Sequence, residues 1–315
     1  MTRAKEELYL TWALDYGGKR LRRVSQFVVE ALGKEVSEKE RHKTSAVEAI
    51  ESFAPKKDSP SPKAREIGKD ELLNLSYYQI DDYLTCPLKY KFVHILRVPI
   101  LEHHTVIYGR AMHEAVTKYF QLKMAGKKME LADLLSAFSA SFDPQGFLDQ
   151  RHQEERFRVG RQALIRFFND EEKRDSKPLY IEKLFSFIFA NNKINGRFDR
   201  IDAYEDGAVI MDFKTSEVDK QKDADKRCRE SDQLAIYAMA YQNIFGVLPV
   251  RVELYFLESG LIGSHAIGEG DLDKVKEKIN QASRGIRGLN FKASPAYMAC
   301  TYCAYNQICP EAFKK

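Results

Sequence analysis

Asp212 and Lys214 stand two residues apart at the end of an apolar segment, residues 208–215, with the sequence AVIMDFKT. Side chains alternate between the two faces of a strand, so the two charged residues are predicted to share one face, with Phe213 on the other. As a surface ion pair they would add only about 0–1 kcal/mol to stability. Joined by further carboxylates, the same pair could take part in catalysis.

A second carboxylate precedes this segment in the chain. Residues 194–204, with the sequence INGRFDRIDAY, carry Asp199. If this segment and residues 207–214 pair as a hairpin, Asp199 and Asp212 reach the same end of one sheet face. Carboxylates of this kind hold Mg²⁺ or Mn²⁺, which activate water and polarise phosphates, and Lys214 would add a positive charge. These residue types predict hydrolysis of a phosphodiester bond.

Three more polar side chains are candidates for the same site. His113, in GRAMHEAV, falls on a helix predicted at 106–125 and offers an imidazole ligand. Gln233 and Tyr237 are spaced i,i+4 on a helix predicted at 231–245, so they share a face where they could meet a substrate backbone. Taken alone, a histidine is more often a packing residue than a ligand, and the Gln233–Tyr237 pair is as often an ordinary solvated or packing pair.

The cysteines predict a metal centre. The C-terminal segment has a Cys-x2-Cys-x5-Cys-Pro spacing at Cys300, Cys303 and Cys309, and Cys86 is the expected fourth ligand. Zinc and a 4Fe-4S cluster both accept four thiolates, and the spacing leaves both open. Cys228, in the charged segment KRCRES, is interpreted as a non-ligand. An odd number of cysteines argues against a disulfide framework.

Helical and strand patterns alternate through the part of the chain that positions these residues. Ser76 is the predicted N-cap of a helix with apolar positions at Tyr77, Ile80 and Leu84. Further helices are predicted at 106–125, 130–141, 153–173, 231–245 and 271–285, and strands at 180–190, 194–204, 207–214 and 250–258. This order predicts an α/β fold with a mixed sheet.

Composition restricts the class of protein. The chain has 315 residues, of which 44% are hydrophobic, and a net charge of +4, which permits a nucleic-acid partner without requiring one. No apolar run approaches the roughly 18 residues of a membrane span, and the N-terminus lacks a secretory pattern. A cytoplasmic protein without a membrane partner is predicted.

The chain changes character near residue 55. Residues 55–69, with the sequence PKKDSPSPKAREIGK, contain three prolines and no periodic apolar face, as is typical of a linker. We expect three parts: residues 1–54, a linker at 55–73, and a domain at 74–315. Within the first part, a strand is predicted at 6–12 and a helix at 24–32.

Residues 74–315 resemble the PD-(D/E)xK nucleases of RecB type, in the iron-sulfur subgroup that includes AddB-like and CRISPR-adaptation nucleases. The resemblance matches GRAMHEAV to the metal-binding histidine, GRFDRID to the first strand aspartate and MDFKT to the central catalytic pair. It also matches the QxxxY element and the cluster ligands. The residues concerned are His113, Asp199, Asp212, Lys214, Gln233, Tyr237, Cys86, Cys300, Cys303 and Cys309.

The resemblance implies a restriction-endonuclease-like mixed sheet flanked by helices, and a Mg²⁺- or Mn²⁺-dependent deoxyribonuclease acting on a single strand or a strand end. In that family pattern His113, Asp199 and Asp212 hold the metal and Lys214 assists the attacking hydroxide. Gln233 and Tyr237 position the substrate, and the four cysteines hold a 4Fe-4S cluster. The alternative function is a non-catalytic DNA-binding module that assists a helicase partner.

A second resemblance covers residues 1–32. Residues 1–11, MTRAKEELYLT, look like the last motif of UvrD/PcrA-like superfamily 1 helicases, in which Arg3 would reach the ATP γ-phosphate. The chain has no G-x-x-x-x-G-K-[ST] phosphate loop and so cannot be a helicase alone. We expect the C-terminal part of a DNA-repair helicase-nuclease, with residues 1–54 as a remnant of the motor domain. A small helical appendage without an ATP-related role is the alternative.

Overall fold

The computed structural model describes residues 23–33, 67–68, 71–100, 102–144, 146–147, 149–174 and 178–313. The chain divides into two units, residues 1–61 and 62–315. The described part of the first unit contains helix α1 (Gln26–Leu32), within the helix predicted at 24–32, and it ends at Gly33 in the left-handed conformation. The strand predicted at 6–12 and Arg3 lie outside the described residues.

The second unit is built on a six-stranded mixed sheet within the described residues. Strand β3 pairs with β2 along one edge, and β1 and β4 share its other edge, followed by β5 and β6. The β1–β3 and β4–β5 pairs are parallel, whereas β2–β3, β3–β4 and β5–β6 are antiparallel. The strands are β1 (Leu73–Leu75), β2 (Pro178–Phe189), β3 (Asn192–Tyr204), β4 (Gly207–Lys214), β5 (Arg251–Phe256) and β6 (Leu261–His265).

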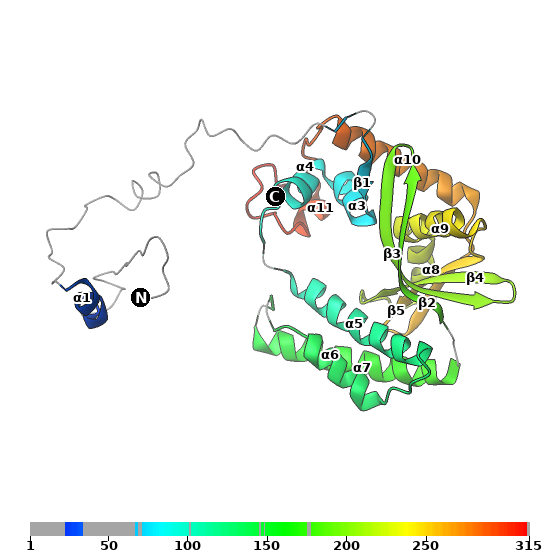
Figure 1. Ribbon diagram of the computed structural model, residues 1–315, viewed down its shortest axis with the longest axis horizontal. Coiled ribbons are helices and arrows are strands. Elements are labelled where there is room, and N and C mark those ends of the chain that lie inside the picture. Colours follow the sequence, from blue (N-terminus) through cyan, green and yellow to red (C-terminus); the bar gives the residue numbers. More distant parts are fainter. Residues whose placement is uncertain are drawn as a thin grey trace. The chain divides into compact units, whose positions relative to one another are not determined.

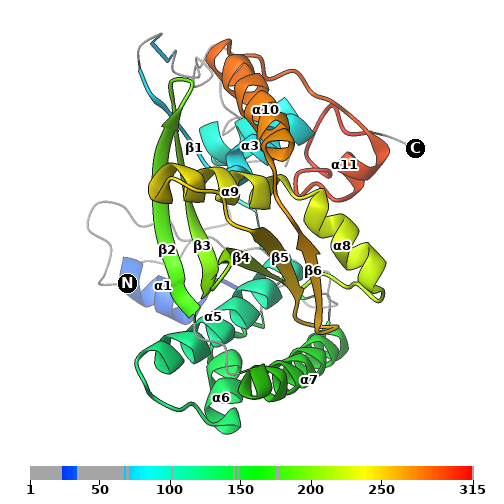
Figure 2. The same cartoon turned by 90° about the vertical axis from the view of Figure 1, so that its right-hand side faces the viewer.

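Helices cover both faces of this sheet (Figures 1 and 2). One group packs on the face that carries Met211 and Phe213: α5 (His104–Met124), α6 (Leu131–Ser141) and α7 (Gln150–Arg174). The other face, which carries Ile210 and Phe198, packs against α3 (Tyr77–Thr85), α9 (Asp232–Phe245) and α10 (Glu269–Arg287). The remaining elements are α4 (Pro87–Tyr90), η2 (Lys91–Ile95), α8 (Gln221–Arg229) and α11 (Tyr297–Thr301).

The predicted fold class, an α/β fold with a mixed central sheet flanked by helices, is confirmed. The predicted strands and helices correspond to β2–β5, α5, α6, α7, α9 and α10, with shifts of a few residues at their ends. Ser76 is the N-cap of α3, and it forms a reciprocal capping box with Gln79.

Six described elements of the second unit were not predicted: β1, β6, α8, α4, η2 and α11. The first two are too short for a periodic pattern to stand out, with three and five residues. Six of the nine residues of helix α8 are charged, and it buries only Ala224 and Cys228, so its apolar stripe is too narrow for a pattern to stand out. It is held instead by close packing on β6, where a Cβ on Gly263 would lie 2.1 Å from the carbonyl oxygen of Ala224.

A buried ionic cluster joins α7 to the middle of the sheet. Arg200 of β3 is 2% exposed and lies 2.7 Å from an oxygen of Asp202 and 3.3 Å from an oxygen of Glu171. Because buried charges are stable only when paired, this cluster fixes β3 against α7. Arg200 directly follows Asp199 in the sequence, so the cluster also holds the backbone that carries Asp199.

None of the described helices is long and apolar enough to cross a bilayer.

Candidate active site

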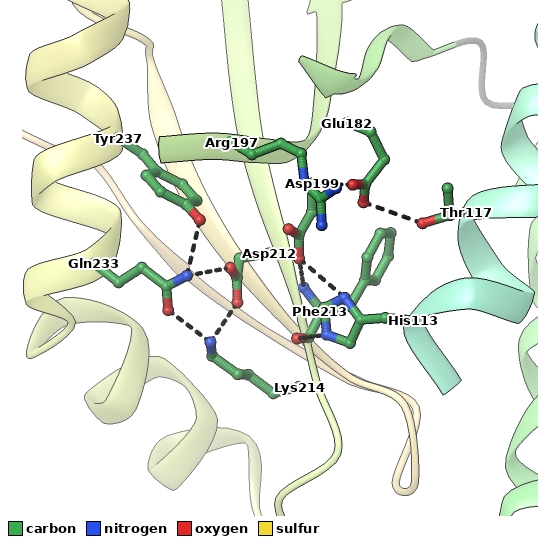
Figure 3. A network of polar contacts seen from close by, with 10 residues as sticks. All are labelled: His113, Thr117, Glu182, Arg197, Asp199, Asp212, Phe213, Lys214, Gln233 and Tyr237. Carbon is green, nitrogen blue, oxygen red and sulfur yellow. Dashed lines mark hydrogen bonds and ion pairs between the residues drawn. The ribbon is translucent and has the colours of Figure 1, made fainter. Parts of the chain in front are cut away.

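The β3–β4 hairpin brings the two predicted aspartates together. Arg200 pairs with Met211 in the antiparallel register, and Asp199 and Asp212 are the residues that lie directly beyond this pair on the two strands. The backbone N–H of Phe213 donates to Oδ2 of Asp199 at 3.0 Å, which ties the two strands at this point. The predicted hairpin is therefore present, and both carboxylates lie at one place on the sheet (Figure 3).

Asp212 and Lys214 form a closed network with α9. Nζ of Lys214 lies 2.7 Å from Oδ2 of Asp212, and Nε2 of Gln233 donates to Oδ1 of the same carboxylate at 2.8 Å. Lys214 also donates to Oε1 of Gln233 at 2.7 Å, and Gln233 Nε2 contacts the hydroxyl of Tyr237 at 2.9 Å. One amide thus fixes both charged groups. Gln233 and Tyr237 are buried, and the side-chain hydrogen bonds that they make to described residues belong to this network.

His113 approaches the carboxylates from α5, on the other side of the site (Figure 3). Its Nε2 lies 2.7 Å from the carbonyl oxygen of Phe213, and its Nδ1 lies 3.5 Å from Oδ2 of Asp199. A carbonyl can only accept, so Nε2 carries the hydrogen, and in a neutral ring Nδ1 presents its lone pair toward Asp199. Burial lowers the pKa of His113, which favours that neutral form.

The site has an excess of negative charge. Burial raises the pKa of Asp199 well above its usual range, and the neighbouring Asp212 carboxylate raises it further. Burial acts to lower the pKa of Lys214, but attraction to Asp212 outweighs it, so the pKa of Lys214 is raised and the ammonium group stays charged. One ammonium group therefore faces two carboxyl groups, and Asp199 is the one left without its own cation.

These donors fit a hard divalent cation. Two carboxylates, an imidazole nitrogen and the carbonyl oxygen of Phe213 converge, and each engaged oxygen of Asp212 keeps a second lone pair. The described residues hold no group of three His, Cys, Asp or Glu side chains that already surrounds a metal position. An ion would therefore draw these donors together, since it is itself the charge that they lack.

Sequence reasoning missed Glu182, on β2. The β2–β3 register pairs Ile181 with Arg200 and Lys183 with Phe198, which sets Glu182 opposite Asp199. The backbone of Glu182 has a φ of 54°, which is rare for a side-chain-bearing residue.

The Glu182 carboxylate is held on both sides. Its oxygens lie 2.5 Å from Nε of Arg197 and 3.1 Å from the hydroxyl of Thr117. Two spacings in the sequence could have indicated these partners. Arg197 lies two residues before Asp199 on one strand face, and Thr117 lies one helical turn after His113.

A single open groove contains these residues. It is lined by the site residues together with residues of α5, α3 and α9. The lining includes Ser76, Tyr77, Tyr78, Arg110, His113, Thr117, Lys118, Gln121, Glu182, Arg197, Asp199, Asp212, Lys214, Gln233 and Tyr237. All six non-cysteine residues predicted from the sequence are among them.

The four predicted cysteine ligands line a separate pocket. Cys86, at the start of α4, and Cys300, Cys303 and Cys309 near the C-terminus surround it. Burial raises the pKa of Cys303, and the thiols of Cys86 and Cys309 add to that effect. Cys228 is not part of this pocket. It is buried on α8, where its Sγ donates to the carbonyl oxygen of Val252 at 3.3 Å, and burial raises its pKa to about 12.

Comparison with known proteins gives one family match. The model of the PD-(D/E)XK nuclease superfamily matches residues 74–310. Among solved structures, the chain is similar to a protein named "Putative exonuclease" from Eubacterium rectale, with 13% identity, 78% of this chain and 91% of that chain covered, and a TM-score of 0.47.

A protein named SSO0001 is similar at 16% identity over 75% of this chain and 96% of that chain, with a TM-score of 0.32. The family assignment follows from the match of the nuclease superfamily over residues 74–310. No curated protein matches this chain.

Proposed function

This chain belongs to the PD-(D/E)XK nuclease superfamily, and we propose that it is a Mg²⁺- or Mn²⁺-dependent nuclease that hydrolyses phosphodiester bonds in DNA. The observation that carries the proposal is the meeting of Asp199, Asp212 and Lys214 where β3 adjoins β4. A site with more carboxylates than ammonium groups repels a phosphate. A divalent cation removes that repulsion, because it binds the carboxylates and the phosphate together.

Asp199 and Asp212 would hold the ion, with Nδ1 of His113 and the carbonyl oxygen of Phe213 as further donors. When bound, the ion supplies a water of lowered pKa and polarises the phosphate. Lys214 stays protonated, so it acts as a fixed positive charge and not as a general base. That charge orients the attacking hydroxide and offsets the charge that develops on the phosphate oxygens.

Gln233 and Tyr237 act in this proposal through their neighbours. Gln233 fixes the Asp212 carboxylate and the Lys214 ammonium group relative to each other, and the hydroxyl of Tyr237 fixes the Gln233 amide. Both side chains are buried, which favours a positioning role. Direct contact of either residue with the substrate is then limited to the edge that faces the groove.

We also propose that Cys86, Cys300, Cys303 and Cys309 hold a 4Fe-4S cluster, with zinc as the alternative. Support comes from the pocket that all four line, although Cys86 and Cys300 are 214 positions apart (300 − 86). A shared centre would close this long loop and tie the start of α4 to the C-terminal segment.

The proposed biological setting is a helicase-nuclease of DNA repair or recombination. Residues 1–54 would be the remnant of a helicase motor, residues 55–73 a linker, and residues 74–315 a nuclease domain of restriction-endonuclease-like fold. The support for the motor partner is the resemblance of residues 1–32 to superfamily 1 helicases.

End-labelled DNA tests the activity directly. Anaerobically purified protein is incubated with single- and double-stranded substrates in Mg²⁺, in Mn²⁺ and in EDTA, beside the Asp212→Asn and Asp206→Asn variants. Asp206 is an exposed aspartate in the β3–β4 turn and serves as the matched control. We expect metal-dependent cleavage that Asp212→Asn abolishes and Asp206→Asn retains. Cleavage that survives in Asp212→Asn, or binding without cleavage by the wild type, would contradict the proposal.

A further inference from the structure

An aromatic side chain stands exposed inside the groove. Tyr78, in the first turn of α3, is 65% exposed, yet it lines the same groove as Asp199, Asp212 and Lys214. Desolvation raises the pKa of Tyr78, whereas the positive charge of the nearby Lys214 acts to lower it. The ring is therefore set among the site residues while its own surface remains open to a ligand.

The backbone that carries this ring is rigid. The hydroxyl of Ser76 accepts from the N–H of Gln79 at 3.3 Å, and the side chain of Gln79 accepts from the N–H of Ser76 at 2.9 Å. Tyr77 packs partly against the core, with its ring 5.4 Å from the ring of Tyr78. Helix α3 is anchored further on, where the hydroxyl of Tyr83 donates to the carbonyl oxygen of Asn290 at 2.7 Å. A fixed aromatic surface loses little entropy when a ligand stacks on it.

The groove also carries basic side chains suited to a phosphate backbone. Arg110 and Lys118 lie on α5, and Arg197 lies on β3. The side chains of Arg110 and Arg197 are 44% and 58% exposed, although each is paired with a carboxylate. Basic groups along a groove, with an aromatic ring beside them, are the combination that binds single-stranded nucleic acid without reading its sequence.

The exposure of Tyr78 bears on the form of the substrate. Inside a duplex each base is stacked between its neighbours, so away from the duplex ends no base face is free for a protein side chain. An unpaired base offers that face. Taking the proposed nuclease function as the premise, we infer that Tyr78 is a stacking platform for an unpaired base next to the cleaved phosphate, so that this ring contributes to a preference for a single strand or a frayed end over an intact duplex.

A cycle of protein and substrate changes tests this inference. The protein variants are Tyr78→Ala, Tyr78→Phe and the control Tyr204→Ala, which removes a half-exposed tyrosine that does not line the groove. The substrates are labelled single-stranded oligonucleotides in which one abasic analogue is moved, a position at a time, across the cleaved bond. The measured quantity is kcat/KM in Mn²⁺.

Stacking on one base predicts that Tyr78→Ala lowers kcat/KM about 5- to 150-fold, whereas Tyr78→Phe and Tyr204→Ala stay near the wild type. At one position the abasic analogue should lower wild-type cleavage by a similar factor, and there Tyr78→Ala should cause no further loss. The wild-type preference for single-stranded over blunt-ended duplex DNA should shrink in Tyr78→Ala.

Three results would overturn the inference. The first is a Tyr78→Ala protein that cleaves as fast as the wild type. The second is a Tyr78→Ala protein whose kcat/KM falls by the same factor whichever position is abasic. The third is a Tyr78→Phe protein whose kcat/KM falls as much as that of Tyr78→Ala, which would indicate a hydroxyl contact instead. If the wild type does not cleave, the proposed function fails separately. The same cycle is then run on binding of labelled single-stranded DNA, measured by anisotropy with Asp212→Asn protein, and it tests Tyr78 independently of cleavage.

Discussion

Replacing Gln233 with methionine tests whether one buried amide organises the catalytic pair. Gln233 is 5% exposed and hydrogen-bonds the Asp212 carboxylate at 2.8 Å and the Lys214 ammonium group at 2.7 Å. Methionine keeps the length and volume of the side chain but can make neither bond. Hydrogen bonds to charged groups contribute about 1.5–3 kcal/mol each, which sets an upper limit of about 3–6 kcal/mol for the pair.

The loss should be smaller than that limit. Asp212 and Lys214 keep their own contact at 2.7 Å, and the Lys214 side chain is 32% exposed, so water can replace part of what is lost. We expect the free energy of unfolding to fall by about 2–4 kcal/mol. The pair would lose its fixed orientation, and removal of such a supporting residue typically lowers activity or metal affinity about 10- to 100-fold.

Urea denaturation measures the free energy of unfolding, and kcat/KM together with a Mn²⁺ titration measures activity and metal affinity. Gln242→Met is the matched control. Gln242 lies on the same helix, and among the described residues its side chain hydrogen-bonds only the exposed Glu269. This control should change the free energy of unfolding by at most about 0.5 kcal/mol and leave kcat/KM near the wild-type value. A folded Gln233→Met protein with unchanged kcat/KM and unchanged Mn²⁺ dependence would refute the positioning role of this amide.

Three further predictions concern the charges and the cysteines. Because burial and Asp212 raise the pKa of Asp199, a proton competes with the cation, so Mn²⁺ affinity should rise by up to about tenfold per pH unit below that pKa and level off above it. Because the pKa of Asp199 is higher in the folded than in the unfolded protein, the ion-free protein should also lose stability as pH rises from the ordinary aspartate pKa to the raised one. A Mn²⁺ affinity that does not vary with pH would contradict this reasoning. Arg200→Leu leaves Asp202 and Glu171 in the core without this partner and should cost about 3–5 kcal/mol in urea unfolding. Arg158→Leu, which removes an exposed pair with Glu155, should leave the unfolding midpoint close to the wild type, and equal effects of the two substitutions would show that the buried cluster is not needed. Cys86→Ser should lose bound iron and acid-labile sulfide in anaerobically purified protein while Cys228→Ser retains them, and full iron content in Cys86→Ser would exclude this thiol as a ligand.

The sequence was most informative where chemistry depends on local geometry. Alternation along a strand was enough to set Asp212 and Lys214 on one face, and their contact at 2.7 Å confirms it. Helical spacing likewise predicted that Gln233 and Tyr237 share a face, and their side chains meet at 2.9 Å. These relations span two to four residues, so they follow from backbone geometry without knowledge of the fold.

Relations between distant segments were harder to predict. Glu182 became visible only through the β2–β3 register, which sets it opposite Asp199, and Tyr78 only through the groove that α3 helps to form. Helix α8 forms although it has almost no apolar residues, because its backbone packs on Gly263 of β6. In each case the deciding contact joins segments that the sequence keeps far apart.

The sequence by itself determined the residue types of the site, their faces on each strand and helix, and the mixed α/β order that brings them together. Tertiary structure decided the charge state and orientation of those residues. Asp199 has a raised pKa because packing removes water and brings Asp212 near, and His113 turns Nδ1 toward Asp199 because the carbonyl oxygen of Phe213 occupies Nε2. Burial and register are properties of the assembled chain, since both depend on which distant groups replace water around a side chain.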